Sequence, residues 1–266
     1  MTDLLVCNPA YFNIDYEINP WMDIGNDVDP SLASRQWEKM CSSLTLIGAN
    51  LKYIKPMYGY PDMVFTANAG LVHGNTIILS NFKHGERRGE KAFFKDWFLK
   101  NGYRVVELPD SICFEGEGDA LFFEDTLFMG YGFRTDLACH SIISKALGVE
   151  VISCELVDPR FYHLDTCFLP IKNRIVYYRE AFSQRSQEIM LRKLVDIGND
   201  TGELDVLNIH EDQAKDFLCN SIEVNNKILS PSDMFSLSFS GRETFTCDMS
   251  EFMKSGGAIK CLTLRL

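Results

Sequence analysis

A repeat of about fifty residues constrains the fold of this 266-residue chain more than any other feature of its sequence. Short apolar segments that end in a turn occur at residues 51–56, 103–109, 149–156 and 204–209. After each comes a pair of strand-like runs joined by a polar turn, and the turns centre near residues 74, 125, 173 and 226. Helical periodicity precedes each apolar segment, over about residues 31–49, 87–101, 137–147 and 183–198. The repeated unit is therefore a strand, a β-hairpin and a helix.

One further copy of this unit can be assembled from the two ends of the chain. It would combine residues 4–8, 244–247 and 260–265. Because no single unit can bury its apolar face alone, the five units must pack around a common axis. The sequence thus predicts an α/β fold, a five-fold pseudo-symmetric propeller of β-hairpin and helix units around a central polar channel. It also predicts a single catalytic domain over residues 1–266.

The charge balance excludes several classes of protein. The chain has 26 Lys and Arg against 37 Asp and Glu, a formal net charge of -11, and so lacks the clustered basic surface that follows a phosphate backbone. No apolar run approaches the roughly 18 residues of a membrane-spanning helix. The first residues contain no basic segment typical of a secretory signal, so we expect a cytoplasmic protein that binds neither nucleic acid nor membrane.

The nine cysteines do not form a disulfide framework or a local metal site. Their number is odd, and no CxxC pair occurs among them. Since the five histidines are equally scattered, we expect no metal and no cofactor. Most of the thiols should be small buried apolar groups, which leaves the question of whether one is a nucleophile.

Unusual polar residues recur at equivalent points, just before the predicted hairpins. These residues are Asp62, Asn68, Glu115, Glu117, Asp119, His163 and Asp165, and Cys261 lies in the final segment. Equivalent points of a closed repeat line its axis, so we expect these side chains to converge. His163 and Asp165 stand at positions i and i+2, which predicts one face of a strand. Cys261 is expected at the start of a strand, and Gly256–Ala258 should leave backbone N–H groups free near its sulfur.

The predicted convergence favours a particular chemistry. A cysteine with a histidine partner can open an electrophilic carbon, but several carboxylates in one pocket repel each other unless the substrate is cationic. A guanidinium group fits, since carboxylates accept its planar fork of donors two at a time. A substrate with a carboxylate at its far end would also need a cation there, for which Arg87 and Arg134 are candidates.

Each of these residues also has a purely structural interpretation. Cys261 could be a buried core thiol, His163 a satisfied structural histidine, and Glu115 and Glu117 solvent-facing turn residues. The run Glu115–Asp119 is Gly-rich, but it lacks the GxGxxG frame and carries acids where a pyrophosphate would sit. Nucleotide binding is therefore not expected.

Five segments in order resemble the guanidino-group modifying enzymes of the pentein superfamily, which have a five-fold α/β propeller fold. They are Glu17–Met22, Pro61–Val72, Phe114–Leu121, Phe161–Phe168 and Gly256–Arg265, and the resemblance extends over essentially the whole chain. Within the superfamily, the segments are most similar to the arginine dihydrolases.

The resemblance implies roles for individual residues. Cys261 would be the nucleophile, His163 the general acid and base, and Glu115 a carboxylate that pairs with His163 or with the substrate. The implied substrate is a small molecule, L-arginine or a derivative. Asp165 would bind its guanidinium, Arg87 and Arg134 its α-carboxylate, and Asn19 its amino-acid end. Asp62, Asn68 and Ala258 would also lie in the binding site. The role of Glu117 is not separable from that of Glu115, and the oligomeric state stays open.

Asn68 departs from the deiminase pattern, which has an aspartate at the comparable position after a Phe-Thr pair. A neutral amide can serve both a cationic guanidinium and a neutral ureido group. This difference favours two successive hydrolyses, which would convert arginine into ornithine, two ammonia molecules and carbon dioxide. Because the chain stops five residues after Cys261, no proline-forming second activity is expected. The alternatives are a one-step arginine deiminase or dimethylargininase, and more remotely a noncatalytic binding module of the same fold.

Overall fold

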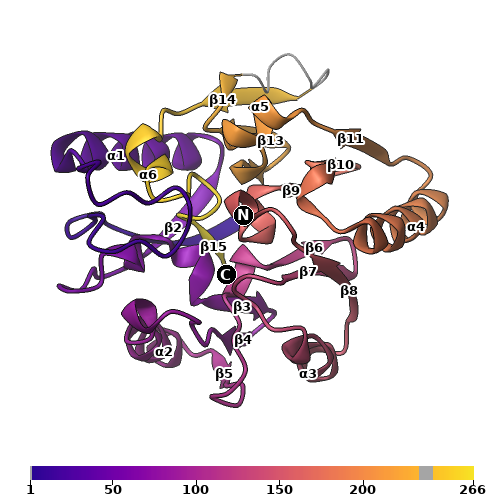
Figure 1. The fold of residues 1–266 in the computed structure, drawn as a ribbon, viewed down its shortest axis with the longest axis horizontal. Helices are drawn as coiled ribbons and strands as arrows, with labels where there is room; N and C mark the ends of the chain where they lie inside the picture. Colours follow the sequence, from indigo (N-terminus) through magenta and orange to yellow (C-terminus); the bar gives the residue numbers. More distant parts are fainter. Residues whose placement is uncertain (1, 234–241) are drawn as a thin grey trace.

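The computed structural model describes residues 2–233 and 242–266, which form five three-stranded sheets arranged around one axis (Figure 1). This arrangement confirms the predicted five-fold α/β propeller. The first sheet contains β3 (Gly70–His73), β4 (Thr76–Leu79) and β5 (Arg104–Val106), and the second contains β6 (Ala120–Phe123), β7 (Thr126–Tyr131) and β8 (Glu150–Glu155). The third contains β9 (Phe168–Ile171), β10 (Arg174–Tyr177) and β11 (Asp205–Asn208), and the fourth contains β12 (Ile222–Val224), β13 (Lys227–Ser230) and β14 (Glu243–Thr246). The fifth sheet contains β15 (Leu264–Arg265), β1 (Thr2–Cys7) and β2 (Ala49–Ile54).

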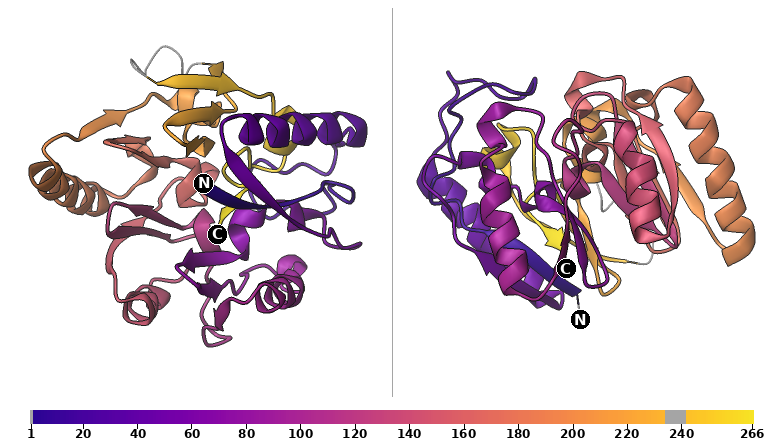
Figure 2. Two further views of the ribbon diagram at one scale, coloured as in Figure 1. Left: turned by 180° about the vertical axis from the view of Figure 1, so that it is seen from behind. Right: turned by 90° about the horizontal axis from the view of Figure 1, so that it is seen from below.

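Four longer helices lie on the outside of the ring (Figures 1 and 2). They are α1 (Pro30–Leu46), α2 (Glu90–Lys100), α3 (Ala138–Leu147) and α4 (Gln184–Thr201), close to the predicted ranges; the short helices α5 (Glu211–Lys215) and α6 (Ser250–Met253) occur nearer the C-terminus. Asp29 caps α1 by accepting hydrogen bonds from the N–H groups of Ser31 and Leu32. In the part of the chain that the structure describes, no helix is both long and apolar enough to cross a membrane.

In four of the sheets, a third strand later in the chain pairs parallel to the second strand of an antiparallel hairpin. The hairpin turns need left-handed backbone, which Gly74, Glu124, Asn173, Asn225 and Asn226 adopt. The predicted segments at residues 103–109, 149–156 and 204–209 therefore each complete the sheet of the preceding hairpin. The sequence analysis predicted these strands correctly, but it grouped each of them with the following hairpin instead of the preceding one.

The composition of the closing unit was also predicted incorrectly. Residues 243–246 form β14 and pair with β13, so they complete the fourth hairpin's sheet. The closing sheet instead takes β2, which pairs parallel to β1, while β15 pairs antiparallel to β1. The last strand spans only Leu264–Arg265, which places Cys261 in the preceding turn, not at the start of a strand. The two chain ends meet there, since the Leu266 N–H donates to the Asp3 carbonyl at 3.0 Å.

Each outer helix buries an apolar face against the strands of its neighbouring sheets. Phe94 and Phe98 of α2 are fully buried against Ile77 and Leu79 of β4. The other three helices bury Trp37, Met40 and Leu44, Cys139 and Ile143, and Met190, Leu194 and Ile197 in the same manner. Fully burying one such side chain contributes roughly 1.5–3 kcal/mol. The apolar layer therefore lies between sheets and helices, and the axis is left to polar residues.

Short 3₁₀ turns precede the first strand of each hairpin and lie around the axis. They cover Thr66–Ala69, Gly116–Gly118, Leu164–Thr166 and Leu218–Asn220. Gly116 has φ of 62°, and a Cβ there would lie 2.5 Å from the Ala67 carbonyl oxygen. Only glycine fits this close approach, which brings the turn that carries Glu115 and Glu117 against the turn that carries Asn68.

Substituting this glycine tests how tightly the axial turns pack. Gly74 in the β3–β4 turn also has positive φ, 57°, but a Cβ there meets nothing within 4 Å. We expect Gly74→Ala to reduce the free energy of unfolding by about 1 kcal/mol. Gly116→Ala adds backbone overlap and should cost roughly 2–4 kcal/mol, as measured by urea denaturation. Equal costs for the two variants would contradict close packing at the axis.

Candidate active site

Cys261 lies at the axis with its sulfur between two polar side chains. The thiol donates to Asp165 Oδ2 at 3.1 Å, and Asn220 Nδ2 donates to the sulfur at 3.0 Å. Only 3% of Cys261 is exposed. The sulfur is thus held by one potential proton acceptor and one donor, an arrangement that fixes its position and lets its charge be compensated.

Asn220 is a site residue that the sequence analysis missed. Its Oδ1 accepts the N–H groups of Ala258 at 2.9 Å and Cys261 at 3.1 Å, and its Nδ2 also donates to the Asp165 carbonyl at 3.1 Å. One fully buried amide therefore connects the turn that carries Cys261 to the turn that carries Asp165. The repeat itself holds the signal, because Asn220 precedes the fourth hairpin as the recognised polar residues precede the other three.

The backbone N–H groups of Gly256, Gly257 and Ala258 were expected to be free near the sulfur, and this expectation is wrong. They donate to Met253 O, Phe252 O and Asn220 Oδ1, respectively. The fully buried Ala258 precedes the turn that carries Cys261, and its N–H, although it donates to Asn220 Oδ1, is still close enough to lower the pKa of the Cys261 thiol. The close approach of this segment satisfies the turn's own backbone.

Burial controls the ionisation of the Cys261 thiol and the Asp165 carboxyl. It raises the pKa of Cys261 well above its ordinary value, and the adjacent Asp165 raises that pKa further. Burial also raises the pKa of Asp165 to about 7, against opposing effects of Lys260, Cys261 and Asn220. A cation placed beside this pair would favour both the thiolate and the carboxylate.

His163 contacts Glu115, and the predicted strand face shared with Asp165 does not exist. His163 Nε2 lies 2.8 Å from Glu115 Oε2, and both residues are buried. The chain is extended at His163 and then enters the 3₁₀ turn Leu164–Thr166, which rotates Asp165 toward Cys261. Among the described residues, no hydrogen bond joins His163 to Cys261. The thiol and the imidazole are therefore bonded to two different carboxylates.

Glu115 is a buried carboxylate whose two oxygens both accept hydrogen bonds. Oε2 accepts from Arg134 Nη1 at 2.9 Å as well as from His163, and Oε1 accepts from the Lys83 N–H at 3.2 Å. Burial alone would raise its pKa, but Arg134, His163 and Arg87 outweigh burial and hold the pKa well below the ordinary value. Glu115 is thus a permanent negative charge beside the imidazole.

Arg134 and Arg87 are both buried and paired with protein groups. Arg134 Nη2 donates to the Ile18 carbonyl at 2.8 Å, and its guanidinium lies 4.6 Å from the centre of the Tyr162 ring. Arg87 forms a two-point ion pair with Glu90 at 2.9 Å. Glu90 was not foreseen, although it stands three residues after Arg87 in the same short charged run.

Asn68 and Asp62 lie beside Arg87. Arg87 Nη1 donates to Asn68 Oδ1 at 2.8 Å, so the Asn68 amide group is turned with its Nδ2 toward the Glu115 carbonyl at 3.4 Å. Asp62 Oδ2 accepts from the Tyr16 hydroxyl at 2.9 Å and lies 4.0 Å from Arg87 Nε. Asn68 therefore has its oxygen engaged and presents its donor side to the site.

Asn19 closes the opposite side of the site. Its Nδ2 donates to the Ser255 carbonyl at 3.0 Å, and its Oδ1 accepts the Trp21 N–H at 2.9 Å. Asn19, Asp62, Asn68, Arg87, Arg134 and Cys261 all line one cavity, which encloses only about 10 Å³. A molecule of several heavy atoms needs more space than this cavity encloses.

Glu117 is separated from this group, which answers a question that the sequence left open. Its Oε2 accepts from Lys260 Nζ at 2.8 Å, and it lines a different cavity, at the end of the axis where the hairpin turns lie. Of the two acids, only Glu115 contacts His163.

Buried carboxylates outnumber buried cations at the axis. Burial raises the pKa of Glu90 to about 7 and that of Asp119 to about 6, and it also raises the pKa of Asp62. Within the described residues, Asp62 Oδ1 and Asp165 Oδ1 are buried without a hydrogen-bond donor. Asp62 lines the cavity at Cys261, and Asp165 bonds to the Cys261 thiol, so their unpaired oxygens are suited to a cationic ligand with several N–H donors.

Comparison with known proteins agrees with this geometry. The family model for eukaryotic N,N dimethylarginine dimethylhydrolase matches residues 8–266. The chain belongs to this family. This chain is 42% identical to the bifunctional arginine dihydrolase/ornithine cyclodeaminase ArgZ of Synechocystis sp., over 99% of this chain and 37% of ArgZ. It therefore spans little more than a third of that relative's length. It is also 37% identical to the N(G),N(G)-dimethylarginine dimethylaminohydrolase of Mycobacterium tuberculosis, over 97% of this chain and 83% of the relative.

Solved structures of the ArgZ N-terminal domain superimpose closely on this family member. One is a cysteine-to-serine mutant bound to substrate, with a TM-score of 0.90 and 41% identity over 100% of this chain and 98% of that one. Another carries an asparagine-to-serine substitution and is covalently bound to a reaction intermediate. The two substituted residues in ArgZ are as far apart along the chain as Asn68 and Cys261 are here.

The raised pKa of Asp165 makes a prediction about stability. A carboxyl whose pKa is about 7 when folded and near 4 when unfolded contributes stability at low pH that is lost as the pH rises through 7. We expect Asp165→Asn to remove this loss. Between pH 5 and pH 8, the free energy of unfolding of the variant in urea should therefore rise by roughly 2–3 kcal/mol relative to that of the native protein. Asp196→Asn, on the exposed face of α4, is the matched control. Parallel pH profiles for native protein and Asp165→Asn would contradict the assigned pKa.

Proposed function

We propose that residues 1–266 form one catalytic domain that hydrolyses the guanidinium group of L-arginine twice, releasing L-ornithine, two ammonia molecules and carbon dioxide. The observation that carries this proposal is the contact at 3.1 Å between the Cys261 sulfur and the buried Asp165 carboxyl, in a site with surplus carboxylates. A guanidinium supplies the missing positive charge and the donors for the unpaired oxygens of Asp62 and Asp165.

In the first round, substrate binding activates the nucleophile. The guanidinium beside Asp165 lowers the high pKa of Cys261, and the thiolate attacks the central guanidinium carbon. The carbon–nitrogen bond to a terminal nitrogen breaks as His163 gives that nitrogen a proton, and ammonia leaves. Water, deprotonated by His163, then displaces the sulfur and leaves a ureido product, citrulline. Glu115, held ionised by its surroundings, stabilises the protonated imidazole.

In the second round, the ureido group stays in the site and is attacked again by Cys261. Asn68 supports this step, because its oxygen is engaged by Arg87 and its Nδ2 can donate to the ureido oxygen. A second ammonia leaves, and water releases a carbamate that decomposes to ornithine and carbon dioxide. The two rounds consume one arginine and two water molecules.

Arg134 has to exchange partners during binding. In the substrate-free structure it donates to Glu115, one of the carboxylates that a substrate guanidinium would approach. Arg87 is fully engaged by Glu90, Asn68 and the Asp62 carbonyl, so Arg134 is the better placed of the two predicted arginines to turn toward an α-carboxylate. Asn19 would then contact the amino-acid end of the substrate.

The relatives support the dihydrolase proposal and also provide its main alternative. The covalent intermediate in ArgZ involves a domain that this chain matches over almost its full length. The similarity to the Mycobacterium tuberculosis enzyme instead favours a one-step reaction on dimethylarginine. The two differ in products, since that reaction would stop at citrulline and release a methylated amine.

We further propose a cytoplasmic location. All nine cysteines are free, and eight of them are buried. Unpaired thiols in this number are typical of a reducing compartment.

Product analysis on L-arginine is the decisive test of the reaction. The native protein should form ornithine and ammonia in a 1:2 ratio with little citrulline, as measured by chromatography and an ammonia assay. Cys261→Ser should be inactive, and Asn68→Asp should release citrulline, because a carboxylate beside Arg87 offers no donor to the ureido oxygen. Clean accumulation of citrulline by the native protein would overturn the dihydrolase proposal, and methylamine formation from methylated arginine would favour the alternative.

A further inference from the structure

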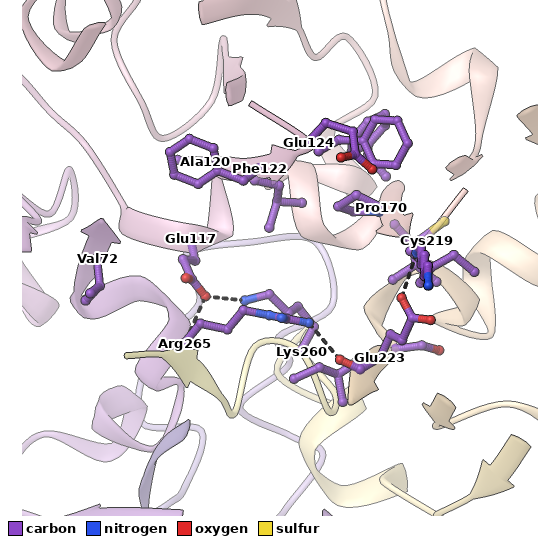
Figure 3. Close-up of a pocket in the computed structure, with 18 residues that line it drawn as sticks. Val72, Glu117, Ala120, Phe122, Glu124, Pro170, Cys219, Glu223, Lys260 and Arg265 are labelled. Atoms are coloured by element: carbon purple, nitrogen blue, oxygen red, sulfur yellow. Dashed lines mark hydrogen bonds and ion pairs between the residues drawn. The ribbon is translucent and has the colours of Figure 1, made fainter. Parts of the chain in front are cut away.

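A second cavity, larger than the first, lies at the hairpin-turn end of the axis (Figure 3). It encloses about 280 Å³ and shares no lining residue with the cavity at Cys261. Strands β6, β9 and β12 and the last residues of the chain surround it. The proposed reaction uses none of these groups, so the cavity needs an explanation of its own.

Much of the cavity wall is apolar. Side chains from several hairpins contribute to it, among them Val72, Phe122, Pro170 and Ile222. Val72, Phe122 and Pro170 are only half-buried, although the residue before each of them in its strand is buried. A small molecule with an apolar body could cover this surface.

The base of the cavity is charged. It contains the buried ion pair between Lys260 Nζ and Glu117 Oε2 at 2.8 Å, in which both side chains are less than a tenth exposed. Arg265 lies beside this pair, and its backbone N–H donates to the same Glu117 oxygen at 3.2 Å (Figure 3). A buried ion pair contributes little net stability by itself, so its position at the base of a cavity points to recognition of a charged group.

The basic groups around the base have donors to spare, and the acids near them are engaged. Arg265 Nη2 donates to the Glu223 carbonyl at 2.8 Å, while its Nε and Nη1 have no partner among the described residues. Glu223 accepts the Lys172 N–H at 2.6 Å and lies 3.3 Å from Arg242. The one exposed acid of the lining, Glu124, is on the opposite side of the cavity from Arg265 (Figure 3).

We propose that this cavity is a second small-molecule site, which binds an apolar monocarboxylate with its carboxylate on Arg265 and Lys260 and its apolar body along Val72, Phe122 and Pro170. Arg265 has free hydrogens on Nε and Nη1, and Lys260 Nζ lies beside it, so each oxygen of a carboxylate can accept from one of these two cations. Its lining residues are distinct from those of the cavity at Cys261.

The test compares three probes of one shape and different charge: 3-phenylpropionate, 3-phenylpropanol and 3-phenylpropylamine. Isothermal titration calorimetry on the full chain should show binding of the carboxylate at least tenfold tighter than that of the alcohol or the amine. Equal binding of the three probes, or no binding of the carboxylate, overturns the proposal.

Two variants locate the binding. Arg265→Ala removes the free donors and should weaken 3-phenylpropionate binding by about tenfold or more. Val72→Phe fills part of the cavity and should also weaken it. Arg104→Ala removes an exposed arginine of β5 outside the cavity and should leave binding unchanged. All three variants should keep native turnover of L-arginine, which shows that they fold; binding that Arg265→Ala and Val72→Phe leave intact lies elsewhere and overturns the proposal.

Discussion

The burial of several carboxylates around a single axis is the constraint on which the rest of this structure depends. Five sheets place their apolar faces toward the outer helices, and the turns before the hairpins fill the centre with Asp62, Glu115, Asp119 and Asp165. Ionising all of these buried groups at once is unfavourable. Arg134, Arg87 and Lys260 offset part of this charge. A cationic substrate would offset more of it, so that part of the cost of burying these charges would be recovered on binding.

In the proposed reaction, the same charges would keep the thiol unreactive until a guanidinium binds beside it. Burial and Asp165 keep Cys261 protonated, and this protects the sulfur in a protein with eight other free cysteines. His163 is held separately by Glu115. The substrate carbon would lie between nucleophile and acid, which brings the two halves of the site into one reaction path.

Repeat spacing and hairpin turns were enough to predict the five-fold fold, because a period of about fifty residues and a polar turn are local properties of the sequence. The strand grouping was not predictable, since β14 and β2 choose their partners through long-range parallel pairing. The positions of Cys261, His163 and Glu115 near the axis followed from the same repeat. Asn220 and Glu90 were missed because their importance comes from contacts across turns, and Glu117 was separable from Glu115 only once its pairing with Lys260 was known.

In the proposed reaction, the guanidinium carbon of the substrate becomes covalently attached to Cys261 during turnover. Acid quenching of the protein during steady-state reaction with L-arginine, followed by peptide mass spectrometry, tests it most directly. We expect an added mass on the peptide that contains Cys261, matching a substrate that has lost ammonia, and no such mass on the peptides of the other eight cysteines. Ornithine formation with no modified Cys261 at any quench time would rule out covalent attachment of the substrate to Cys261.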